Sequence, residues 1–75
     1  MIKELYNMLH KEAEADKAKA LLSLELLGNR GVGIGDHTTE DYYKNATDAL
    51  NALADADDRL EALQKYFLLK DNLLG

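Results

Sequence analysis

The chain of 75 residues has no cysteine and no proline, and it contains only five glycines and two histidines. Without cysteine it can form neither a disulfide nor a thiolate metal site, and it has no thiol nucleophile. A chain this short buries only about 60% of the surface of its unfolded form, and small domains usually compensate with disulfides, a metal or oligomerisation. The composition therefore favours a single domain, residues 1–75, that is stabilised by oligomerisation.

Positive charge is also scarce. Nine Lys and Arg residues stand against fourteen Asp and Glu residues, which gives a formal net charge of -5. No five-residue window forms the basic cluster that neutralises phosphates, so binding to duplex DNA or RNA is disfavoured. Unbroken apolar runs are far shorter than the roughly 20 residues that cross a bilayer, and no charged start leads into an apolar signal core. We expect a soluble, cytoplasmic protein that binds neither nucleic acid nor membrane.

The absence of proline leaves two segments in which nothing interrupts a helix, predicted over residues 2–27 and 39–72. Apolar residues recur in each segment with the spacing of a buried helix face. The repeats are Tyr6, Ala13, Ala20 and Leu27 in the first segment, and Ala46, Leu53, Leu60 and Phe67 with Ala49, Ala56 and Leu63 in the second. The loop between them, residues 28–38, holds four of the five glycines. The pattern predicts an all-α, antiparallel helical hairpin.

The predicted helix ends set a register. Gly28 follows the last apolar residue of the first helix, where a left-handed C-terminal residue is expected, and Thr38 is a suitable N-cap for the second. Folding the chain near Gly33 makes the numbers of facing residues add up to about 66, so that Ala20 would face Ala46. At about 1.5 Å per residue the first helix is roughly 39 Å long and the second roughly 50 Å. The second helix should therefore extend beyond the first.

This extension and the leucine-rich end of the first helix would expose apolar side chains, which on a small protein usually mark an interface. The predicted interface residues are Leu22, Leu26, Tyr66, Phe67, Leu68, Leu69, Leu73 and Leu74. We expect a homo-oligomer, with a dimer favoured, in which two hairpins form a four-helix bundle. Another protein stays open as a partner. The predicted function is that of a small interaction module.

The glycine-rich loop permits an alternative. Successive glycines and a helix N-terminus can bind a phosphate or a nucleotide. The candidate ligands are Arg30, Gly33, Gly35, His37, Thr38 and Thr39. However, the run has no preceding strand and no Gly-Lys-Ser/Thr ending, so it fits neither phosphate-binding fingerprint. A turn in which Val32 and Ile34 cover the end of the bundle is the favoured interpretation, and a small-ligand binder is the alternative.

The loop also carries a resemblance. "VGIGDH" at residues 32–37, followed by an acidic, Ala- and Leu-rich helix that ends in "LEALQKYF", resembles short helical proteins seen in bacteriophage genomes and environmental sequence. The resemblance covers about the second two-thirds of the chain. It implies an origin in a phage or mobile element, and hence a phage accessory protein, and it implies no activity.

Acidic side chains raise the question of a metal site or an enzyme. They are Glu12, Glu14 and Asp16 in the first helix, and Asp55, Asp57, Asp58 and Glu61 in the second. A dimetal bundle needs Glu-x-x-His pairs, and neither histidine follows a glutamate at that spacing. The predicted register places Asp57 near His10, but the one serine of the chain, Ser23, lies about three turns away along the first helix. We therefore predict no catalytic residue, no metal and no cofactor, and interpret the Asp57–His10 pair as a polar contact that fixes register.

Overall fold

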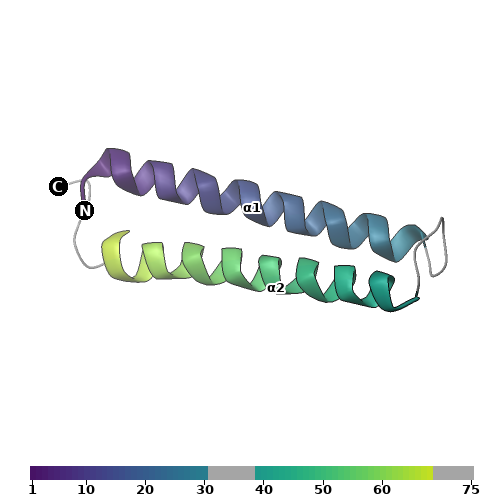
Figure 1. Cartoon of the computed structure of the whole chain (residues 1–75). Coiled ribbons are helices and arrows are strands. Elements are labelled where there is room, and N and C mark those ends of the chain that lie inside the picture. Colours follow the sequence, from purple (N-terminus) through teal and green to yellow (C-terminus); the bar gives the residue numbers. More distant parts are fainter. Residues whose placement is uncertain (31–38, 69–75) are drawn as a thin grey trace.

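The computed structural model describes residues 1–30 and 39–68, and the predicted hairpin is confirmed (Figure 1). Helix α1 spans Lys3–Arg30 and helix α2 spans Thr39–Leu63, and a π-helical turn, η1, follows at Gln64–Leu68. The two helices run antiparallel along their whole length, and the molecule measures 54 × 15 × 15 Å along its principal axes. No strand occurs in these two described segments, so the fold is an all-α helical hairpin.

Helix α1 continues past its predicted end. Its hydrogen bonding begins where the Tyr6 N–H donates to the Ile2 carbonyl oxygen at 3.1 Å, and the helix runs through Gly28 to Arg30. The prediction that Gly28 ends the helix in a left-handed conformation was wrong. A glycine inside a helix costs only about 1 kcal/mol relative to alanine, and no neighbouring atom crowds this position. Three further residues of helix are therefore tolerated.

A hydrogen bond connects the start of α2 to the end of α1. The Tyr42 hydroxyl donates a hydrogen bond of 2.8 Å to the carbonyl oxygen of Leu27. Leu27 is among the last four residues of α1, whose carbonyl groups have no partner within the helix. The tyrosine thus supplies one of the missing donors and fixes the level at which the two helices meet.

The buried seam between the helices is narrow and rich in alanine. Its buried residues are Tyr6, Ala13 and Ala20 on α1, and Ala49, Ala56 and Leu63 on α2. They recur every seven residues, as predicted. The other predicted set of the second segment, which comprises Ala46, Leu53 and Leu60 in α2 and Phe67 in η1, is only half-buried. Because alanine ends at Cβ, the helix axes can approach closely. Because these side chains are small, the seam removes little apolar surface from water.

The observed register differs from the predicted one. The numbers of residues in contact across the seam add up to 69 for Leu27 with Tyr42, 74 for Lys17 with Asp57 and 75 for Asp16 with Arg59. The predicted value of about 66 was too low by at least three residues, close to one helical turn. The reason is the longer α1, since its last residue and the first of α2 add up to 69.

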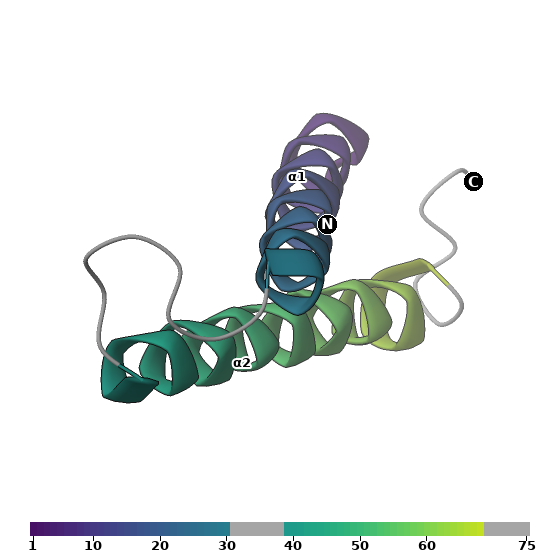
Figure 2. The same cartoon turned by 90° about the vertical axis from the view of Figure 1, so that its right-hand side faces the viewer.

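The two helical segments have nearly the same length. The 28 residues of α1 lie beside the 25 residues of α2 and the 5 of η1, and the N-terminal end of α1 and η1 lie at the same end of the hairpin (Figure 1). The predicted extension of roughly 11 Å is therefore absent from the described residues, and residues 69–72 of the predicted helix lie outside them. Figure 2, a view along the hairpin, shows that the axes of α1 and α2 are inclined to each other.

The alanine seam yields a stability prediction. Ala56 has no exposed surface, whereas Ala54, two residues earlier on the same helix, is exposed. Ala56→Leu should lower the free energy of unfolding by about 1–3 kcal/mol, because the larger side chain pushes the helices apart. Ala54→Leu serves as the matched control and should change it little. Urea unfolding followed by circular dichroism measures both, and equal stabilities of the two variants would show that the seam is not closely packed.

Candidate functional site

Most of the predicted ligand-binding residues lie outside the described part of the chain. Gly33, Gly35, His37 and Thr38 belong to residues 31–38. Arg30 is the last residue of α1, and Thr39 is the exposed first residue of α2. The described residues therefore do not test the ligand-binding hypothesis, which stays a prediction.

The predicted contact between Asp57 and His10 is not formed. His10 Nδ1 lies 3.2 Å from a carboxylate oxygen of Glu14, one turn further along α1, and its ring stacks on Tyr6 with 5.7 Å between the ring centroids. Asp57 instead lies 2.9 Å from the ammonium group of Lys17. The prediction was wrong because it depended on the incorrect register, which placed the two residues at the same level.

Two ion pairs join the helices. The guanidinium group of Arg59 lies 2.9 Å from Asp16 on α1 and 3.0 Å from Asp55 on its own helix, and the second pair is that of Lys17 with Asp57. Asp16 and Lys17 are neighbours in sequence, so they point about 100° apart on α1 and flank the seam. Asp16 presents a negative charge to α2 and Lys17 presents a positive one. Because the two charges have opposite signs, this pair of contacts favours one register of the hairpin over others.

Hydrogen bonds hold two cationic groups in their charged form. The bond to Asp16 is the main cause that raises the pKa of Arg59 above its ordinary value, and the bond to Asp48 is the main cause that raises the pKa of Lys44 above its ordinary value. Both groups therefore stay protonated at neutral pH and keep their ion pairs with these aspartates. In the described residues, no group of three or more His, Asp or Glu residues could hold a metal ion.

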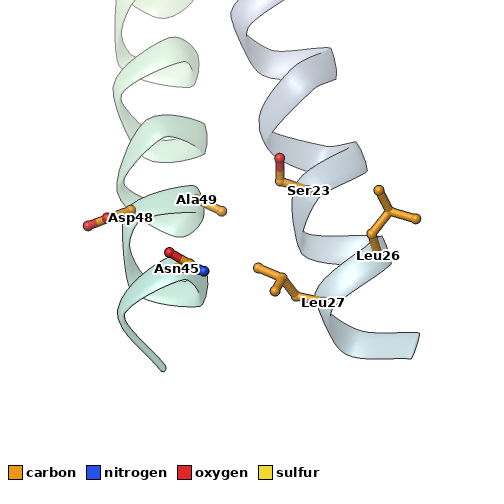
Figure 3. A pocket seen from close by; sticks show the side chains of 6 residues that line it. All are labelled: Ser23, Leu26, Leu27, Asn45, Asp48 and Ala49. Carbon is orange, nitrogen blue, oxygen red and sulfur yellow. The ribbon is translucent and has the colours of Figure 1, made fainter. Parts of the chain in front are cut away.

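Small side chains leave an open groove along one edge of the seam. The part nearest the loop, of about 660 Å³, is lined by Ser23, Leu26, Leu27, Asn45, Asp48 and Ala49 (Figure 3). Leu27 points toward α2 across this space. A second part of about 330 Å³ shares Ser23 and Ala49 and continues to the Asp16–Arg59 ion pair. Ser23 is thirteen residues from His10 along α1, roughly 20 Å, so the groove holds no pair of nucleophile and base from these two residues.

The predicted interface residues fall into three groups. Leu22, Leu26, Tyr66 and Leu68 are exposed, as an interface in a larger assembly requires, and Phe67 is half-buried. Leu69, Leu73 and Leu74 lie outside the described residues. The exposed residues are divided between the outer face of α1 and the π-helical turn, so they do not form one patch at the end of the second helix.

Sequence reasoning missed part of the exposed apolar surface. The additional large side chains are Met1, Ile2, Leu5, Met8 and Leu21 from the first helical segment, and Tyr43 and Leu50 from the second. Spacing could have revealed several of them, because Met1, Leu5 and Met8 are separated by four and three residues, Leu22 follows Met8 by two heptads, and Leu26 follows Leu22 by four residues. The residues assigned to the buried seam drew attention to only one face of α1.

Comparison of the chain with models of protein families, with curated proteins and with solved structures finds no match. Neither described helix combines the length and the apolar character that crossing a membrane requires. The candidate site is therefore the exposed apolar surface itself, with the groove beside it.

The ion pair of Asp16 with Arg59 gives a second prediction. Asp16→Asn should lower the urea midpoint of unfolding slightly, because it removes a contact between the helices, and the difference should shrink in 1 M salt, which screens exposed charges. Asp58 is exposed and has no ion pair in the described structure, so Asp58→Asn is the control and should leave the midpoint unchanged. If the two variants unfold at the same midpoint in low salt, the pair does not stabilise the hairpin.

Proposed function

We propose that this chain is a small helical interaction module that functions by self-association. The observation that supports the proposal is the ratio of buried to exposed apolar residues. Six hydrophobic residues are buried, and four of them are alanines, whereas eleven large hydrophobic side chains of the described segments are exposed. Apolar surface of this extent on a small protein usually forms an interface.

The thin seam supports the same proposal energetically. Burial stabilises by roughly 0.8 kcal/mol for each methylene-sized group, so an alanine methyl contributes little compared with leucine or phenylalanine. Below about 70–80 residues a hydrophobic core rarely supplies more than a few kcal/mol even when it is well packed. Without cysteine, this chain has no disulfide to add to that core. Burial of the exposed leucines and methionines between subunits would supply the missing stabilisation.

A pair of hairpins is the simplest assembly that achieves this burial. Two antiparallel hairpins can pack as a four-helix bundle, in which each helix has a neighbour on two sides. In such a bundle the open groove along the seam would be covered by the second subunit, and the leucines of α1 would become core residues. A homodimer with twofold symmetry is the assembly that we favour.

The proposal predicts the mass of the protein in solution. The chain has a mass of 8.4 kDa, and light scattering at micromolar concentration should give at least twice this value. Dilution should lower the average mass toward that of one chain, because assembly follows mass action. A mass of one chain at every concentration up to the millimolar range would overturn the proposal.

A further inference from the structure

Helix α1 carries a second apolar stripe that the hairpin does not use. Its positions alternate at spacings of four and three residues, the 3.5-residue repeat of a coiled-coil seam. They are Met1, two residues before α1 begins, and Leu5, Met8, Glu12, Ala15, Lys19, Leu22 and Leu26 within it, here together called the outer stripe. All eight residues are exposed, and six of them are apolar. Met8, Ala15 and Leu22 each follow a buried seam residue by two positions, about 200° around the helix. Glu12, Lys19 and Leu26 each precede a seam position by one residue, about 100° around the helix, and line the openings between α1 and α2. The outer stripe therefore runs from the edge of the groove to the side of α1 that is turned away from α2.

We propose that the outer stripe binds the outer stripe of a second copy of this chain, with the two α1 helices antiparallel. The inference rests on the proposed function and specifies its interface. The argument for this occupant is charge complementarity. The stripe has one acidic residue, Glu12, and one basic residue, Lys19, and neither forms a close ion pair within the described hairpin. Glu12 forms no ion pair in the described structure, and Lys19 reaches Asp16 only at 4.0 Å with 80% of its side chain exposed.

The two charges select the orientation. In a parallel pair, equal positions face each other, so Glu12 would meet Glu12 and Lys19 would meet Lys19 of the second copy. Like charges at a helix interface are unfavourable. In an antiparallel pair centred on the stripe, the numbers of facing residues add up to 27. Glu12 then lies one layer from Lys19 of the second copy, and twofold symmetry forms this contact twice.

The apolar side chains near the two ends fit the same register. Leu5 faces Leu22 and Met1 faces Leu26, whereas Met8 faces Lys19 and Glu12 faces Ala15 nearer the centre. The small Ala15 allows the helices to approach closely there. The equivalent face of α2 offers no such stripe. The exposed residues Tyr43 and Leu50 are seven apart, but the next positions at this spacing are Asp57 and Gln64. A second α1 is therefore the partner that the described surface fits best.

The first test compares two leucines of almost equal exposure. Leu22, on the outer stripe, is 57% exposed, and Leu50, on α2, is 56% exposed. Leu22→Asp should raise the dissociation constant of the dimer by about tenfold or more, because it places a charge in an apolar layer. Leu50→Asp is the control and should leave the constant unchanged. Sedimentation equilibrium measures the constant, and circular dichroism checks that each variant keeps its helicity. Weaker dimerisation of Leu50→Asp but not of Leu22→Asp overturns the inference.

The second test determines the orientation and does not depend on a destabilising change. Because the chain has no cysteine, Leu5→Cys and Leu22→Cys each introduce a single thiol. In the antiparallel register a disulfide should form when the two variant proteins are mixed and oxidised, and neither variant should cross-link strongly with itself. In a parallel pair each variant would cross-link with itself, and this result overturns the inference.

The two tests separate failure of this inference from failure of the proposed function. A dimer that forms through another surface, or in parallel, contradicts the outer-stripe pairing and leaves the self-associating module intact. A chain that is monomeric at every concentration, with no cross-link in the mixture, overturns both.

Discussion

The close approach of α1 and α2 along an alanine seam is the constraint on which the rest of this structure depends. Ala13, Ala20, Ala49 and Ala56 let two backbones lie side by side, and the larger Tyr6 and Leu63 are the buried residues nearest the N-terminal end of α1. Polar contacts at the edges then fix the register, through the hydroxyl of one tyrosine and two ion pairs between the helices. Geometry is well specified by these contacts, but the free energy from burial is small, because methyl groups remove little apolar area from water.

A thin seam leaves the larger apolar side chains on the outside. Leucines and methionines that would form the core of a larger domain lie instead on the outer face of α1, at coiled-coil spacing. The helix thus has a second apolar face beside the one that α2 covers. A helix with more than one apolar face is typical of the interior of a bundle. This distribution connects the fold to the proposed self-association more directly than any single residue does.

The sequence predicted the helical hairpin and the repeats of its seam, because periodic alanine, leucine and tyrosine positions report directly on helix faces. It did not predict the register, since this depends on how far α1 continues beyond Gly28, and a glycine penalises a helix too weakly to end it. One further error followed from this residue, namely the wrong partner for His10. The expected extension of the second helix is absent from the described residues, and residues 69–72 lie outside them. The outer stripe was readable as a heptad pattern, but Glu12 and Lys19 interrupt it and hide it from a search for apolar runs.

The central claim is that the hairpin depends on self-association for its stability, and the dependence of unfolding on protein concentration tests it most directly. Urea unfolding would be followed by helicity at two concentrations that differ by about a hundredfold. For a folded dimer in equilibrium with unfolded chains, the midpoint must rise with concentration, since mass action favours the assembled state. The account predicts this rise. An identical midpoint at both concentrations, with full helicity before the transition, would contradict it and show that the alanine seam is sufficient alone.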